Sequence, residues 1–316
     1  MIDEAWNEYR GWAKRARDLQ ASTNRWNLYA LVCAALAAAC GAAATQWSDD
    51  AGLAKILSFA AAATAALTPI LGKEILSVGN ESKWIAARAI AEAIKSECFR
   101  FAAKVDDYAG ADALDRFIAK REALTQTAAE AKITPADDPI PAAGDKRKPS
   151  VPLDPEWYLD NRVTDQIKFY ATGQHRHEQA ISRLRLVSFG AAVVAALFGV
   201  AGSMGYGSFA PWIGALITTA TAIAAFGLLD RRQFLAVTYS AMGTSLARIK
   251  ERFEAGTLDL KQLVAVVEDL LASEHAAWTK RMVQTIPSRP TAAPQDQNKP
   301  QRQDKKDPAE TPPAGG

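Results

Sequence analysis

The sequence predicts an all-α membrane protein, built as two tandem repeats of a transmembrane helical hairpin flanked by cytoplasmic amphipathic helices. Three uncharged, mostly apolar segments of the 316-residue chain carry this prediction: 26–48, 56–72 and 186–229. A helix needs about 20 apolar residues to cross a bilayer, so the longest segment has room for two crossings. The average composition hides this pattern, because apolar residues make up an ordinary 49% of the chain.

Four membrane spans follow, near 28–46, 54–72, 186–205 and 209–229. Apolar residues surround each predicted helix and form no single stripe, which is typical of a helix in lipid. The alternative is a water-soluble bundle with two very apolar hairpins. That bundle would have no solvated face along residues 186–229, so we favour the membrane.

Lysines and arginines flank both hairpins on one side. The positive-inside rule therefore places both termini and the central linker in the cytoplasm, in a multi-pass protein. The flanking residues are Arg10, Lys14, Arg15, Arg17, Arg25, Lys73 and Lys83 for the first hairpin, and Lys168, Arg176, Arg183, Arg185, Arg231 and Arg232 for the second.

Apolar residues at helical spacing predict the remaining helices and divide the chain into domains. The first domain, 1–130, has helices over 4–25, 74–108 and 113–130, and the second, 155–284, has helices over 157–185, 231–254 and 258–282. Six prolines within 135–155 predict a semi-rigid, solvated linker over 131–154. Residues 285–316 are rich in proline and nearly free of large apolar side chains, which predicts a disordered tail.

The residues that most enzymes and metal sites need are scarce. The net charge is +2, and there are three cysteines and three histidines. We find no glycine-rich phosphate loop, metal-binding motif or acid–base dyad. We therefore expect no enzyme activity, no cofactor, no metal and no nucleic-acid partner.

Two groups of residues resemble a known family. In the second half these are Pro155–Tyr158, Arg162, Asp165–Ile167, Phe169–Tyr170, Arg231–Phe234 and Ser273–Trp278, and in the first half Trp84, Arg88, Glu92, Lys95 and Phe99–Phe101. This pattern around a hairpin resembles the SLATT-type two-transmembrane effector domains, in two tandem copies. Aligning the copies puts Thr238 at the place of Arg88 and Met242 at that of Glu92, so the second copy lacks that charged pair.

The resemblance implies a bacterial inner-membrane effector of a conflict or antiphage system that uses nucleotide signalling. It also implies a homo-oligomer that forms a pore or disrupts the membrane, triggered by a separate sensor or a nucleotide second-messenger protein. The alternative is a membrane-anchored interaction platform that recruits a cytoplasmic sensor. A transporter is disfavoured, because the uncharged segments 26–48, 56–72 and 186–229 contain no Asp, Glu, Lys, Arg or His.

One candidate cytoplasmic contact is the pair Arg88 and Glu92. The two residues are four apart on a predicted helix and share a face with Lys95. One interpretation is that they contact a partner or ligand. The other is that they lie on an ordinary solvated helix face and form weak ion pairs.

Small and hydroxyl-bearing residues in the spans are candidates for pore lining or helix packing. Such residues let helices approach closely or line water, although threonine also bonds to its own helix. The candidates are Thr64 and Thr68, Thr218 and Thr221, and the row Ala195, Gly199 and Ser203.

Overall fold

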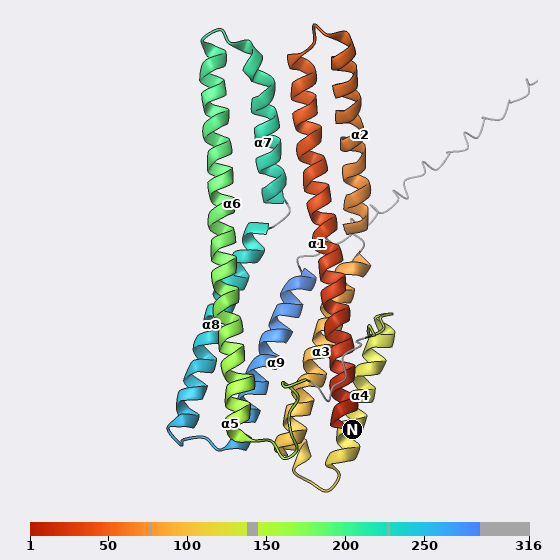
Figure 1. Ribbon diagram of the computed structural model, residues 1–316, viewed down its shortest axis with the longest axis vertical. Helices are drawn as coiled ribbons and strands as arrows, with labels where there is room; N and C mark the ends of the chain where they lie inside the picture. Colours follow the sequence, from red (N-terminus) through yellow and green to blue (C-terminus); the bar gives the residue numbers. More distant parts are fainter. Residues whose placement is uncertain (76–77, 138–144, 226–227, 285–316) are drawn as a thin grey trace, which may run out of the picture.

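The computed structural model describes residues 1–75, 78–137, 145–225 and 228–284, and the predicted disordered tail 285–316 lies outside them. Figure 1 shows two tall helical hairpins standing side by side above a bundle of shorter helices. The described residues form only helices and connecting turns, which confirms the predicted all-α fold class.

The first hairpin consists of α1 (Ile2–Gln46) and α2 (Ala51–Ile75). The 45 residues of α1 form one unbroken helix, about 68 Å long at 1.5 Å per residue. This helix therefore continues from the bundle through the whole first hairpin. After the hairpin, α3 (Val78–Ala103) and α4 (Ala113–Glu130) return through the bundle, close to the predicted 74–108 and 113–130.

The second half has the same order of elements. It begins with α5 (Pro155–Tyr158), a π-helical turn (Leu159–Thr164) and the long α6 (Asp165–Ser203). The second hairpin is completed by α7 (Ala210–Ala225), and α8 (Leu228–Glu254) and α9 (Leu260–Gln284) then return to the bundle. We call the lower parts of α1 and α6 together with α3, α4, α5, α8 and α9 the basal bundle.

Three helical stretches are long and apolar enough to cross a membrane: Ile2–Gln46, Ala51–Leu71 and Pro155–Ser203. The fourth predicted span is helical over Ala210–Ala225, and residues 226–227 within it lie outside the described chain. Large apolar side chains on these stretches point outward, with 76% of Phe59, 70% of Leu186 and 61% of Leu197 exposed. Such exposure is unfavourable in water and suggests an integral membrane protein.

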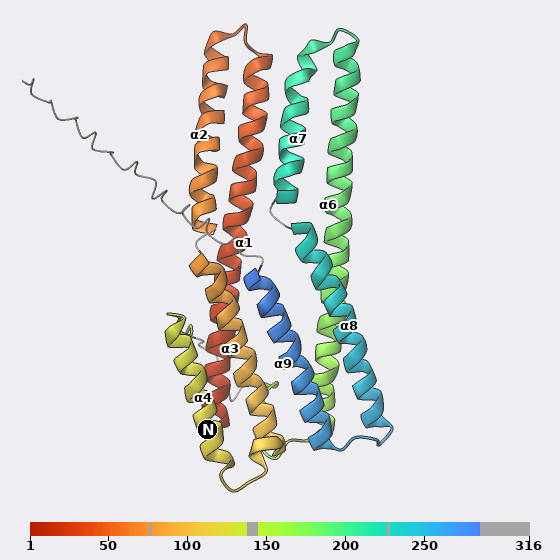
Figure 2. The same cartoon turned by 180° about the vertical axis from the view of Figure 1, so that it is seen from behind.

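The two hairpins contact each other through α1 and α7, which lie side by side in both views (Figures 1 and 2). On α1, Ala30 and Ala42 are buried. Small side chains allow two helix backbones to approach closely where the hydrophobic effect offers no help.

The two halves share one hydrophobic core in the basal bundle. Phe99 of α3 lies 6.0 Å from the ring of Trp6 and 5.4 Å from that of Tyr158, measured between ring centroids. These aromatic contacts join the first half of the chain to the second. Trp6, Tyr9 and Trp12 of α1 are buried at the predicted helical spacing.

The proline-rich linker packs closely on α1 and is not simply solvated as its composition predicts. The amide of Ala136 donates a hydrogen bond to the carbonyl of Gly11 at 3.1 Å. A Cβ atom at position 11 would lie 2.9 Å from the Ala136 carbonyl oxygen, so this approach needs glycine. Ile133 and Leu153 are buried at the two ends of the linker.

Candidate functional site

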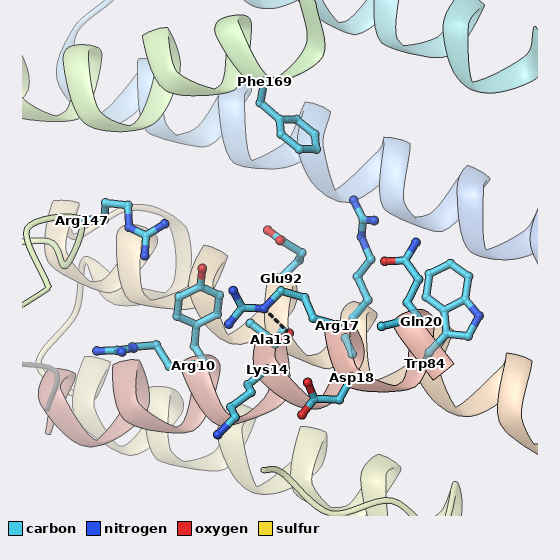
Figure 3. A pocket seen from close by; sticks show the side chains of 15 residues that line it. Arg10, Ala13, Lys14, Arg17, Asp18, Gln20, Trp84, Glu92, Arg147 and Phe169 are labelled. Carbon is cyan, nitrogen blue, oxygen red and sulfur yellow. Dashed lines mark hydrogen bonds between the residues drawn. The ribbon is translucent and has the colours of Figure 1, made fainter. Parts of the chain in front are cut away.

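The basal bundle contains a cleft between the two halves of the chain. It consists of two adjoining cavities of about 800 and 480 Å³, which share Arg88, Glu92, Arg147 and Phe169 in their linings. We call this pair of cavities the basal cleft. Figure 3 shows the larger cavity, with α1 and α3 on one side, Phe169 of α6 on the other and Arg147 of the linker at one end.

Basic side chains dominate the lining of the basal cleft. Three carboxylates also line it, those of Asp18, Glu92 and Asp165. The described lysines and arginines of the lining number nine: Arg10, Lys14, Arg17, Arg88, Lys95, Arg147, Arg162, Lys168 and Arg176. Clefts lined by one sign of charge concentrate counter-ions of the other sign.

The predicted pair Arg88 and Glu92 lies inside this cleft and not on an open helix face. The guanidinium of Arg88 stacks over the ring of Trp278 of α9, 5.1 Å from its centroid. Glu92 lines both cavities and a third of about 530 Å³ between α3 and α9. Each side chain thus faces the second half of the chain.

Electrostatics keep Glu92 ionised. Burial raises the pKa of its carboxyl, but Lys95 and then His275, Arg162 and Arg88 lower it, to about 2. The carboxylate therefore offsets part of the positive charge of the cleft at every physiological pH.

We expect the variant Glu92→Gln to lose up to about 3 kcal/mol of stability at pH 7, because each unit of pKa shift corresponds to about 1.4 kcal/mol. A depressed pKa gives stability that is complete above the ordinary pKa of 4.5 and disappears as the pH falls toward 2. Thermal unfolding of both proteins in detergent from pH 7 to pH 2 measures this difference. Glu122→Gln, an exposed substitution on α4, is the control, and an equal deficit at both ends of the range would contradict the account.

A buried charge network lies beside the cleft. Glu268 of α9 is fully buried and accepts hydrogen bonds from Arg162 Nε at 2.9 Å, Arg162 Nη2 at 2.8 Å and the Tyr158 hydroxyl at 2.9 Å. Burial lowers the pKa of Arg162, but the neighbouring Glu268 carboxylate raises it above its ordinary value. Burial and then the charge of Glu268 raise the pKa of Tyr158 well above its ordinary value.

The π-helical turn Leu159–Thr164 contains Arg162. Its guanidinium lies 4.9 Å from the centroid of the Phe99 ring. Arg162 is only 3% exposed and lines the smaller cavity of the basal cleft. Its buried Nη1 atom has no hydrogen-bond partner among the described residues. Isolated π-helical turns often occur at functional sites.

Sequence reasoning did not single out Glu268 or the cleft as a whole. A signal for Glu268 existed, since it lies on the apolar stripe of α9 formed by Leu263, Val264, Val267 and Leu271. The cleft has no comparable signal, because its basic residues are spread from 10 to 176 along the chain.

The threonines that are candidates for pore lining or helix packing lie in the hairpins, away from the cleft. Thr64 donates to the carbonyl of Ala60 at 2.7 Å, and Thr68 to that of Thr64 at 3.1 Å. Thr218 and Thr221 of α7 are exposed. Bonds within one helix satisfy a hydroxyl without any partner helix.

The row of small residues on α6 faces outward. Ala195 is partly buried, whereas Gly199 and Ser203 are exposed. A Cβ atom built at Gly199 meets nothing within 4 Å.

Comparison with known families covers both halves of the chain. Residues 158–278 match the model of the SMODS and SLOG-associating 2TM effector domain 1, and residues 4–115 match DUF4231, a protein family of unknown function. The second half thus carries the resemblance expected for it, whereas the first half matches a different model and a second SLATT copy is not shown. No curated protein and no solved structure matches the chain. The described residues contain no cluster of three His, Cys, Asp or Glu suited to a metal.

Proposed function

We propose that this protein is a membrane effector of a bacterial conflict system that uses nucleotide signalling, and that it oligomerises to form a pore or disrupt the inner membrane. The match of residues 158–278 to a 2TM effector domain supports the class of function. In this proposal both termini and the basal bundle are cytoplasmic, and the chain acts without catalysis of its own.

The outward face of α6 is the observation that carries the pore mechanism. None of its most apolar 18-residue window is buried in the single chain. Gly190, Gly199 and Gly202 on this helix each have open space beyond the Cα atom. A face that combines large apolar side chains with small ones suits both lipid and the helix of another subunit. Four spans alone would close around a packed core, so conduction requires several subunits.

The interaction platform remains the second candidate, because the basal bundle has its own core and its own charged cleft. In that case the hairpins serve as anchors and the basal bundle recruits a sensor.

Inducible expression in bacteria, with a dye that reports membrane potential, tests the pore. We expect potential and viability to fall together after induction in the presence of the infection signal. Intact potential under active signalling would reject the pore. Exchanging both hairpins for unrelated spans separates the candidates, since the platform retains its activity after this exchange and the pore loses it.

A further inference from the structure

We propose that the basal cleft binds a phosphorylated nucleotide. The positive-inside rule accounts for basic residues near the spans, but it does not require them to face one another across a cavity. The chain as a whole has a net charge of +2, yet its cleft gathers nine basic side chains around three lining carboxylates. Two further carboxylates, Asp145 and Glu268, pair with Arg10, Arg147 and Arg162. The basic side chains still outnumber the carboxylates around them, and like charges held together repel one another.

Several of these basic side chains lie outside ion-pair distance of every described carboxylate. No described carboxylate forms an ion pair with Arg17, Lys168 or Arg176. Arg147, at the junction of the two cavities, bonds through Nε to Asp145 at 3.2 Å, which leaves its terminal nitrogens for another acceptor. Guanidinium groups bind phosphate oxygens in pairs of parallel hydrogen bonds.

The deep end of the cleft holds an unused donor. Arg162 is buried, and its Nη1 atom has no hydrogen-bond partner among the described residues although Glu268 binds its other two nitrogens. An unsatisfied buried donor is costly, typically about 1–3 kcal/mol, and a ligand oxygen would remove that cost.

An aromatic ring distinguishes a nucleotide from a simple phosphate ion. Phe169 projects from α6 into the larger cavity, opposite Arg17 and Trp84 (Figure 3). It is 48% exposed although its ring packs on Tyr170 and Tyr239. An exposed aromatic ring held beside arginines is the usual platform for a stacked base. The cavity of about 800 Å³ also lies in the range typical of small-molecule sites.

The proposed nucleotide site connects the helices that lead into the two hairpins. Its lining comes from α1, α3, the linker, the π-helical turn, α6 and α9, and both α1 and α6 continue without a break into the hairpins. A nucleotide held between Arg17 of α1 and Phe169 of α6 would therefore fix the two hairpins relative to each other. Its role as a trigger rests on the proposed function, whereas binding itself does not.

The phosphate group of a lipid headgroup could also bind these arginines and lysines. The experiment therefore distinguishes a nucleotide from a lipid as the ligand. The full chain is purified in neutral detergent and titrated with a fluorescent ATP analogue, with and without competing tripolyphosphate or phosphatidylglycerol. We expect saturable binding that ATP and tripolyphosphate displace and phosphatidylglycerol does not. The absence of saturable binding, or displacement by the lipid alone, would overturn the nucleotide assignment.

Variants then place the ligand in the cleft. We expect Arg147→Gln and the double variant Lys168→Gln/Arg176→Gln each to weaken nucleotide binding at least tenfold. Phe169→Leu should weaken binding of the ATP analogue at least fivefold and leave tripolyphosphate binding unchanged. Arg183→Gln, an exposed substitution on α6 outside the cleft, is the matched control. Unchanged binding in the double variant, whose side chains carry no ion pair that the fold needs, would exclude the site.

The binding result and the pore result are independent. Saturable binding without any fall in membrane potential would reject the pore and retain the site. A fall in membrane potential without nucleotide binding would retain the pore and reject the nucleotide site.

Discussion

Replacing Glu268 by glutamine is expected to lower the free energy of unfolding by about 3–5 kcal/mol, the range for breaking a buried ion pair. Glu268 is fully buried, and it accepts hydrogen bonds from two nitrogens of Arg162 and from the hydroxyl of Tyr158. Glutamine keeps the shape of the side chain but removes its charge. Arg162, only 3% exposed, would then be a buried cation without its partner.

The measurement is thermal unfolding of the purified protein in detergent, followed by circular dichroism. Glu251→Gln, an exposed substitution on α8, is the matched control and should change the midpoint little. The double variant Arg162→Leu/Glu268→Leu removes both charges and should recover most of the lost stability, because the desolvation cost of the pair disappears with it. A double variant as unstable as Glu268→Gln would show that the ion pair itself is net stabilising.

The candidate membrane spans and the helices are predictable from sequence because both are local properties. An uncharged segment identifies a candidate span wherever it packs. Helical spacing predicts the range of α4 as the structure has it, Ala113–Glu130. The unbroken passage of α1 from the basal bundle into its hairpin also follows from the absence of any helix-breaking residue between Trp12 and Trp26.

The site was only half predictable, because it depends on tertiary packing. Arg88 and Glu92 were found through their spacing on one helix, but that spacing says nothing about Trp278 or His275 of α9, which approach from the other half of the chain. The positive-inside rule is by itself a sufficient reason for arginines on α1 beside a span. Nothing in the sequence relates these arginines to Arg147.

The packing of the linker was also not predictable from its composition, because it depends on tertiary contacts. Proline content predicted a solvated spacer, whereas Trp6 Nε1 donates a hydrogen bond to Asp145 Oδ2 at 3.1 Å and holds the linker against α1. This contact also sets the position of Arg147, two residues further on. A high proline content disfavours regular secondary structure in a segment. It does not prevent that segment from packing against a neighbouring helix.

The second large effect is expected from a pair of arginines on the outward face of α6. Val193 and Leu197 are 41% and 61% exposed there, near the middle of the third predicted span. Leu or Val favours the membrane centre by roughly 0.3–0.6 kcal/mol, whereas arginine costs about 2.5–3.5 kcal/mol. The variant Val193→Arg/Leu197→Arg should therefore lose about 6–8 kcal/mol of insertion free energy, enough to keep the second hairpin out of the bilayer.

Labelling of the turn between α6 and α7 measures this loss in intact cells. The native cysteines Cys33, Cys40 and Cys98 are replaced by alanine, and Ser208→Cys supplies one thiol for a membrane-impermeant maleimide. In the proposed topology this thiol is labelled from outside, and the two arginines should abolish the labelling. Leu114→Arg, at an exposed leucine of α4 in the basal bundle, should leave it unchanged. Full labelling despite both arginines would mean that the exposed face of α6 does not contact lipid, and that it faces protein or a water-filled pore instead.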